Sequence, residues 1–302
     1  MTQIRFIAPL PTRLGVAPSY LWLQKGNWAT LLDFLIQRFP DVDSATWLDR
    51  MERGEVVDES GHRLGKESPY FWGKRIFYYR ELEQETPIPF QETILFQDQH
   101  ILVVDKPHFL PVIPTGRFLH ETLLVRLKNK LDLSDLSPIH RLDRETAGVM
   151  IFSVNRTTRG AYQSLFQQRS VIKEYQALAA QLSDYSTPFV YRSLLVGGTP
   201  FFRTQEIPGV ANSETHIEII EQLGAISRYR LKPLTGKKHQ LRVHMAALGV
   251  PIINDAFYPL ALPCKEDDVS NPLKLLARSI HFTDPISGQD RYFESGLVLN
   301  PD

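Results

Sequence analysis

Two spacings of hydrophobic residues alternate along this chain. Apolar positions at helical spacing predict helices over 28–39, 44–53, 120–131 and 238–248. Short apolar or alternating runs predict strands over 101–104, 149–154, 171–178, 216–220, 226–232 and 275–283. Because strands outnumber helices and several links are short, we expect an α+β fold with a mixed, mostly antiparallel sheet and flanking helices.

The first ninety residues have a different pattern. Two short helices are followed by a strand and turn over 54–61 and a strand over 75–79. The segment 81–89 is acidic and carries two prolines, which is typical of a linker. We therefore expect a small accessory α/β module over 1–90 and a larger domain over 91–302.

The starts and faces of two helices can be predicted in more detail. Asn155 is a suitable N-cap for a helix that reaches Gln168 and buries the apolar residues Ala161, Leu165 and Phe166. Gly236 permits a turn into the later helix, whose first turn would carry Lys237 and Lys238. On that helix, Arg242 lies at the edge of the apolar face formed by Leu241, Met245 and Leu248.

Composition narrows the class of protein. The 302 residues have a formal net charge of zero and are 43% hydrophobic, which suits about two globular domains. Cys264 is the single cysteine, so an intramolecular disulfide is excluded. No apolar run reaches the length of a membrane helix, and the N-terminus lacks the order of a secretory signal. We expect a cytoplasmic protein that does not enter a membrane.

The charges are unevenly distributed along the chain. No acidic residue occurs from Gln222 to Asn254, although this window holds six lysines and arginines. A second acid-free window runs from Thr146 to Lys173. These windows predict a positive face that would attract a polyanion such as RNA.

Asp143 is the first candidate for chemistry. It stands between Arg141 and Arg144, just before an apolar strand. A carboxylate beside positive charge remains ionised, so it suits a nucleophile or a base. An exposed cluster of ion pairs would give the same local pattern.

Two further segments could form a site with Asp143. Tyr175, in the strand 171–178, could stack on a nucleobase, although an aromatic residue in a strand is also typical of a core. The segment 234–245 combines Gly236 with lysines and suits phosphate binding, although a solvated basic helix has the same pattern. His239 and His244 are five residues apart, which does not fit a helical zinc site. We therefore expect no metal there, and because no phosphate-binding glycine loop or dinucleotide fingerprint occurs, we expect no cofactor.

Residues 92–290 resemble the RluA family of RNA pseudouridine synthases. The matching motifs are Asp105–Pro107, His140–Asp143 with Thr146–Gly148, Lys173–Tyr175, Thr235–His244, Asn254–Pro259 and Leu275–Ala277. Departures from the family pattern are Ala147 in place of Ser, Lys237 in place of Arg and Asn254 in place of Gly.

The resemblance implies roles for individual residues. Asp143 would be the catalytic aspartate, Tyr175 the ring that stacks on the target uracil and Arg242 the basic partner of the aspartate. Leu275 would form the floor of the pocket, and Arg141 would occupy the gap that the flipped base leaves in the stack of bases. The further RNA-binding residues would be Lys237, Lys238, His239 and Gln240.

The implied reaction isomerises uridine in ribosomal or transfer RNA without a cofactor. The expected protein is a monomer whose partner is RNA, and its first ninety residues faintly resemble an alpha-L RNA-binding module. Two alternatives remain: an RNA-binding or ribosome-assembly factor without catalysis, and a metal hydrolase built on His140, Asp143, His239 and His244.

Overall fold

The protein divides into two compact units. The computed structural model describes residues 8–82, 84–182, 188–262 and 268–301. The first unit comprises the chain up to Glu85 together with 114–120, and the second comprises 86–113 and 121–302. The chain thus passes back into the first unit once, which the linker prediction over 81–89 did not anticipate.

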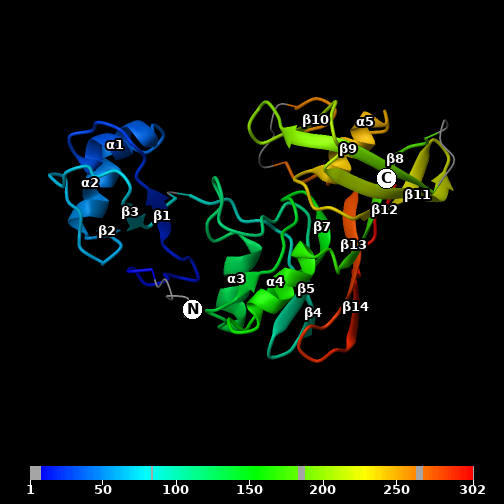
Figure 1. The fold of residues 1–302 in the computed structure, drawn as a ribbon, viewed down its shortest axis with the longest axis horizontal. Coiled ribbons are helices and arrows are strands. Elements are labelled where there is room, and N and C mark those ends of the chain that lie inside the picture. Colours follow the sequence, from blue (N-terminus) through cyan, green and yellow to red (C-terminus); the bar gives the residue numbers. More distant parts are fainter. Residues whose placement is uncertain (1–7, 83, 183–187, 263–267, 302) are drawn as a thin grey trace. The chain divides into compact units, whose positions relative to one another are not determined.

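The first unit packs two helices on a three-stranded antiparallel sheet (Figure 1). Thr30 caps the first helix by accepting a hydrogen bond from the backbone N–H of Asp33, and Asp43 caps the second. The helices predicted over 28–39 and 44–53 are therefore present, with slightly later starts or earlier ends. The elements are β1 (Ser19–Trp22), α1 (Leu31–Arg38), α2 (Ser44–Glu52), β2 (Val56–Asp58) and β3 (Arg75–Tyr78), with the strand order β1-β3-β2.

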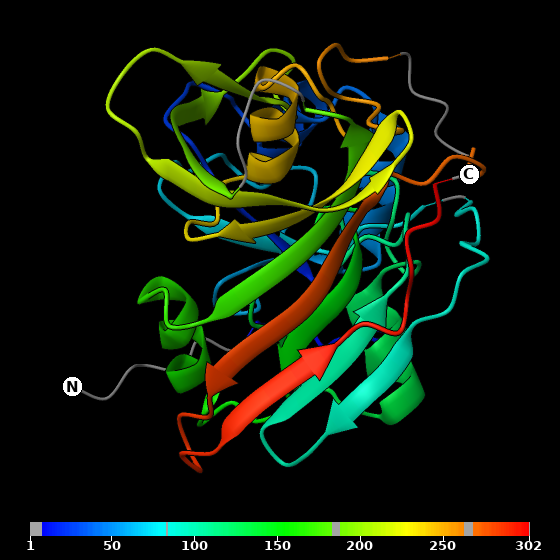
Figure 2. The ribbon, with the colours of Figure 1, turned by 90° about the vertical axis from the view of Figure 1, so that its right-hand side faces the viewer.

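The second unit is built on one large sheet. Its strand order is β10-β9-β11-β12-β8-β13-β7-β5-β4, with β14 paired to β13 and β6 to β7. Figure 2 shows α5 lying on one face of the yellow and green strands. The strands are β4 (Thr93–Gln97), β5 (Ile101–Lys106), β6 (Ser137–Pro138), β7 (Ala147–Ser153), β8 (Ile172–Ala180), β9 (Phe189–Gly197), β10 (Thr204–Ile207), β11 (Ser213–Leu223), β12 (Ile226–Pro233), β13 (Leu275–Thr283) and β14 (Asp290–Glu294). The helices are α3 (Leu123–Leu131), α4 (Arg159–Gln167) and α5 (Gln240–Ala247).

The predicted fold class is confirmed. Within the described residues, β13 and β7 form the parallel pair of this sheet, and its other pairings are antiparallel. The two strands approach closely at Gly148, which has a φ of +115°. A Cβ atom there would lie 2.2 Å from the carbonyl oxygen of Ala277, so the position requires glycine.

The N-cap predicted for the helix after β7 is wrong. Asn155 is no N-cap, because its side chain accepts the N–H of Thr157 in a turn and α4 begins only at Arg159. Tyr162 is the fully buried residue of α4, and the predicted Leu165 and Phe166 are partly buried and pack against the same core cluster.

The later helix also begins later than predicted. His239 has a left-handed φ of +54°, which prevents the helix from starting before Gln240. Lys237 and Lys238 therefore lie in the preceding loop and not in a first helical turn. Among the described residues, no helix has the length and apolar character needed to cross a bilayer.

Candidate active site

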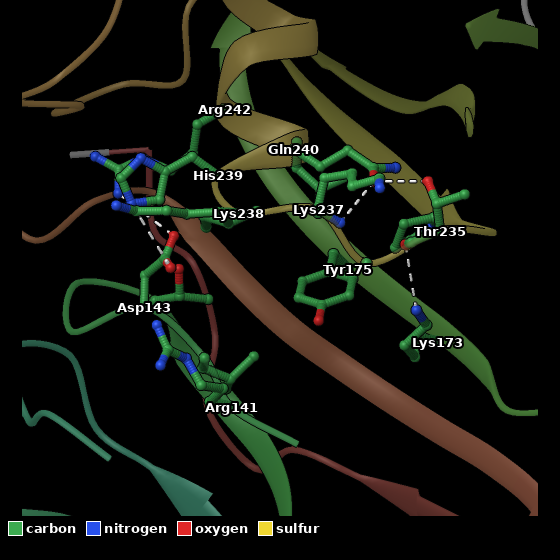
Figure 3. Close-up of a pocket in the computed structure, with 16 residues that line it drawn as sticks. Arg141, Asp143, Lys173, Tyr175, Thr235, Lys237, Lys238, His239, Gln240 and Arg242 are labelled. Atoms are coloured by element: carbon green, nitrogen blue, oxygen red, sulfur yellow. Dashed lines mark hydrogen bonds and ion pairs between the residues drawn. The ribbon is translucent and has the colours of Figure 1, made fainter. Parts of the chain in front are cut away.

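One pocket of about 400 Å³ brings the predicted site residues together. The loop before β7, strand β8, the loop before α5 with the first turn of that helix, and the start of β13 provide its walls (Figure 3). The predicted residues that line it are Arg141, Asp143, Tyr175, Lys237, Lys238, His239, Gln240, Arg242 and Leu275. Residues separated by more than a hundred positions in the sequence thus share one cavity.

Lys106 anchors the loop that carries Asp143. This lysine is fully buried, and its ammonium donates to the carbonyl oxygens of Pro107, Leu110 and Arg144 at 2.9–3.0 Å. Burial lowers the pKa of Lys106 to about 7, and the three carbonyl acceptors favour the charged form. The last of these carbonyls belongs to the residue after Asp143, so Lys106 fixes the loop beside the carboxylate.

His140 anchors the other end of the same loop. Its Nε2 accepts the backbone N–H of Ile151 on β7 at 3.1 Å, and its ring stacks on Phe166 at 4.7 Å. Burial lowers the pKa of His140 to about 3, so the ring is neutral and free to accept. The loop is therefore tied to β7 on both sides of Asp143, since β7 itself begins at Ala147.

Arg242 is the cation that faces Asp143. Its NH1 group lies 3.5 Å from Asp143 Oδ2 and 3.8 Å from Glu145 Oε2. Its Nε and NH2 groups form a fork on Asp255, at 2.8 and 2.6 Å. The backbone N–H groups of Phe257 and Tyr258 also donate to Asp255, so this carboxylate is rigidly placed. Arg242 is 1% exposed and lines the pocket, where its remaining amino group faces Asp143.

The two arginines beside Asp143 in the sequence have other surroundings. Arg144 donates its Nε–H to the carbonyl oxygen of Phe109, and Arg141 is an exposed side chain on the pocket rim. Among the described residues, Asp143 forms an ion pair with Arg242 and lies 3.8 Å from the imidazole of His239. The sequence around Asp143 therefore gave no local sign of its ion pair with Arg242, which comes from a segment far along the chain.

His239 is the second neighbour of the carboxylate. Its Nε2 lies 3.8 Å from Asp143 Oδ1, and its Nδ1 lies 2.9 Å from the hydroxyl of Tyr258. That hydroxyl accepts the N–H of Thr204, so its own proton is directed to Nδ1. This arrangement favours the tautomer whose Nε2–H faces Asp143. Burial lowers the pKa of His239 to about 3, with nearby Arg242 adding to the effect.

Gln240 holds the loop before α5 instead of pointing a free amide into the cavity. Its Oε1 accepts from the Thr235 hydroxyl at 2.7 Å and from the N–H of Lys237 at 3.1 Å. Its Nε2 donates to the carbonyl of Glu214 and the hydroxyl of Thr215, both at 2.9 Å. All four hydrogen-bonding positions of the amide are thus used by the protein. The side chains of Lys237 and Lys238 remain exposed at the rim.

Tyr175 and Leu275 form the apolar part of the cavity. Tyr175 on β8 lies opposite Ala277 of β13 and Leu231 of β12, and burial raises the pKa of its hydroxyl. Leu275 is 3% exposed and belongs to the core beneath it. Figure 3 shows Asp143 and Tyr175 on two sides of the pocket. Lys173, two residues before Tyr175, also lines the pocket. Its ammonium donates to the carbonyl oxygen of Thr235 at 3.4 Å.

The predicted positive face is smaller than the acid-free windows suggest. Arg230 pairs with Glu174 and Glu218, and Arg228 pairs with Glu221. These acids lie on the neighbouring strands β8 and β11. The acid-free windows in the sequence could not reveal such contacts between strands. Among the described pocket residues, the basic side chains at the rim are Arg141, Lys173, Lys237 and Lys238.

Three contributors to the site were missed in the sequence. Asp255 was recognised only as part of a motif, and its role as the fixed partner of Arg242 depends on a contact between distant segments. Lys106 and Lys173 also lay in quoted motifs. A lysine that closely follows the apolar run 101–104 was the available signal for Lys106, since a charged residue that ends a buried strand must find acceptors there.

The side chains considered for a metal site do not converge. His140 accepts from a backbone N–H, and His244 is bonded to the hydroxyls of Ser193, Ser213 and Thr215. In the part of the chain that the structure describes, no three His, Cys, Asp or Glu side chains are grouped to hold a metal ion.

Comparisons with known proteins identify the family of the chain. The family model described as RNA pseudouridylate synthase matches residues 100–247. The chain is 31% identical over 219 residues to the dual-specificity RNA pseudouridine synthase RluA of Haemophilus influenzae, covering 71% of this chain and 97% of that protein. It is 30% identical to the mitochondrial tRNA pseudouridine(32) synthase of Saccharomyces cerevisiae, covering 80% of this chain and 53% of the relative.

A solved structure extends the likeness to the fold. Human RNA pseudouridylate synthase domain containing 4 superposes with a TM-score of 0.55 at 25% identity, covering 68% of this chain and 88% of that one. The bacterial relative is matched over nearly its full length at more than 30% identity. The chain therefore belongs to the RluA-type family of RNA pseudouridine synthases and is an isomerase.

Proposed function

We propose that the pocket receives a uridine flipped out of a ribosomal or transfer RNA, and that Asp143 carries its isomerisation to pseudouridine. The observation that supports this assignment most strongly is the joint placement of Asp143, Tyr175 and Arg242 around one cavity of about 400 Å³. A carboxylate held 3.5 Å from a buried guanidinium stands opposite an aromatic ring in that cavity.

Base flipping comes before the chemistry. Unstacking a base costs a few kcal/mol, which contacts to the RNA backbone must offset. Lys173, Lys237 and Lys238 at the rim provide cations for the phosphates. Arg141 is exposed beside the pocket mouth and fills the space that the flipped base leaves in the stack.

Inside the pocket, the uracil stacks on Tyr175 above the apolar floor at Leu275. The N1–C1′ bond breaks, the uracil turns, a new bond joins C5 to C1′, the C5 proton leaves, and N1 takes up a proton. Asp143 either attacks the sugar or the base, or removes a ribose proton. In each route Arg242 keeps the carboxylate oriented, because its own position is fixed by Asp255. The Nε2–H of His239 faces the second carboxylate oxygen.

The class of RNA is supported by the names of the relatives. The yeast relative is a tRNA pseudouridine synthase, and the bacterial relative is called dual-specific. A binding protein without catalysis would not need the Asp143–Arg242–Asp255 arrangement, which buries a charged fork at the pocket. We further propose a monomer in the cytoplasm, which light scattering and localisation of a tagged protein can measure.

The proposal is tested by mapping pseudouridine in total RNA. RNA from a strain lacking this protein is compared with RNA from the same strain expressing the wild type or Asp143→Asn. We expect one or a few uridines to be modified only with the wild type, which also identifies the substrate. Modification restored equally by Asp143→Asn would reject the assignment of Asp143.

A further inference from the structure

The hairpin of β9 and β10 presents an aromatic ring to solvent beside the active site. Phe201, in its turn, is 91% exposed. Its ring packs edge-on against Phe202, with centroids 5.6 Å apart, and Phe202 packs on Phe257 at 5.1 Å. A phenylalanine exposed to this degree gains almost nothing from burial in the fold.

Hydrogen bonds tie this hairpin to the wall of the pocket. The N–H of Thr204 donates to the Tyr258 hydroxyl at 2.8 Å, and that hydroxyl lies 2.9 Å from Nδ1 of His239. Arg203 donates to the carbonyl of Pro259 at 2.6 Å, and its guanidinium lies 4.9 Å from the Tyr258 ring centroid. The loop 257–259 therefore fixes the position of the β9–β10 turn. The same loop contacts His239 and Arg242, which lie beside Asp143.

A row of rings connects the pocket with the exposed side chain. The ring of Phe257 lies 5.7 Å from that of His239, and the Arg242 guanidinium lies 4.8 Å from the Phe257 centroid. Phe202 and then Phe201 continue this row outward. The RNA strand must leave the pocket on both sides of the flipped uridine, so a ring continuous with the pocket wall is within reach of a neighbouring nucleotide.

We propose that Phe201 stacks on an unpaired nucleobase that flanks the target uridine. This contact rests on the proposed function, since it assumes that RNA occupies the pocket. An aromatic ring suits this task because every base offers a π face, so the contact tolerates different flanking sequences. Arg203 next to it adds positive charge where the backbone of that nucleotide would pass.

Binding of a fluorescein-labelled single-stranded oligouridylate tests the contact. We expect Phe201→Ala to raise the dissociation constant about fivefold or more, which is the effect of losing one stacked base. Phe201→Trp should retain wild-type affinity, whereas Phe201→Leu, which is apolar but has no π face, should resemble alanine. Val210→Ala is the matched control, because Val210 is 90% exposed on the loop that follows β10.

Isomerisation kinetics on a transcript that contains the mapped uridine separate the two proposals. Phe201→Ala should raise KM more than it lowers kcat. Wild-type affinity in both Phe201→Ala and Phe201→Leu would overturn the stacking contact, and the role of Asp143 would stand if Asp143→Asn is inactive. If the wild type shows no isomerisation but Phe201→Ala still weakens RNA binding, the proposed function fails and the RNA contact survives. Reduced self-association with unchanged RNA affinity would overturn the contact in favour of a protein interface.

Discussion

Arg242 holds Asp255 with a two-point fork, at 2.8 and 2.6 Å, and so turns its third nitrogen toward Asp143. The acid side chain is fully buried and the guanidinium is 1% exposed. Such a pair contributes little net stability of its own, but removing one partner leaves an unpaired buried charge. The Arg242–Asp255 pair therefore orients Arg242, so that the cation beside Asp143 has a single orientation.

Removing Asp255 tests this arrangement. We expect Asp255→Ala to lower the free energy of unfolding by roughly 3–5 kcal/mol, because Arg242 would lose its fork in a buried position. Urea denaturation measures the loss. Glu145→Gln is the control, since Glu145 lies 3.8 Å from the same arginine but is partly exposed. Equal losses in both variants would contradict a special role for the fork.

Replacing Arg242 separates binding from turnover. Arg242→Lys retains a positive charge but cannot form the fork on Asp255 and reach Asp143 together. We expect kcat to fall roughly a hundredfold or more, as for other preorganised charge contacts, with a much smaller change in RNA affinity. Single-turnover kinetics and filter binding provide the two numbers. A change confined to affinity would make Arg242 a phosphate clamp.

Gly148 is predicted to tolerate no side chain. In Gly148→Ala the new Cβ would meet the Ala277 carbonyl oxygen at 2.2 Å, at a φ of +115°. We expect a loss of about 3 kcal/mol or more in unfolding free energy, since both the clash and the backbone conformation are unfavourable. Gly160→Ala on α4 meets nothing within 4 Å, and it should change stability by less than about 1 kcal/mol. Comparable stability of the two variants would contradict the close approach of β7 and β13.

The stability of the protein should decline in mild acid. Burial lowers the pKa of His244 to about 4 and that of His239 to about 3, from 6.5. As the pH falls below 6.5 the unfolded chain takes up protons that the folded chain cannot bind, so folding becomes less favourable until about pH 3–4. Each histidine contributes up to about 1.4 kcal/mol per pH unit in this window.

Denaturant titrations at pH 7.5 and pH 5 measure this dependence. His244→Gln should show a shallower decline than the wild type, whatever its stability at neutral pH, because it lacks one of the buried imidazoles. A decline of the same slope in wild type and variant would show that His244 does not contribute.

The sequence predicted which residues form the site better than it predicted how they contact each other. Motif spacing identified Asp143, Tyr175 and Arg242, and all three line one pocket. The local pattern around Asp143 indicated neither its ion pair with Arg242 nor the anchors that Lys106 and His140 provide for its loop. Such anchors connect segments far apart in the chain, so local patterns cannot reveal them.

Strand pairing explains the other main difference. The window 222–254 contains no acid, yet the register places Glu218 opposite Arg230 and Glu221 opposite Arg228. Charge along a sequence therefore overestimates charge on a sheet surface. Strand positions in the interior were predicted well, since an apolar run such as 101–104 needs no knowledge of its partners, although this strand continues to Lys106. The late start of α5 was missed because it depends on the left-handed backbone of His239.

The departure at Asn254 is explained by the backbone. This residue has a φ of +62°, a conformation that glycine adopts freely and that asparagine tolerates better than other side chains. The substitution therefore preserves the turn that leads into Asp255. Nothing in the structure explains the alanine at position 147.

Loss of hydrogen from uracil C5 measures the central step directly, because that proton must leave when C5 joins the ribose. RNA transcribed with tritium at C5 and containing the mapped uridine is incubated with wild-type protein or with Asp143→Asn. We expect the wild type to release tritium into water in proportion to the enzyme added, and Asp143→Asn to release none while still binding the RNA. Equal release by the two proteins would contradict the account that Asp143 performs the reaction.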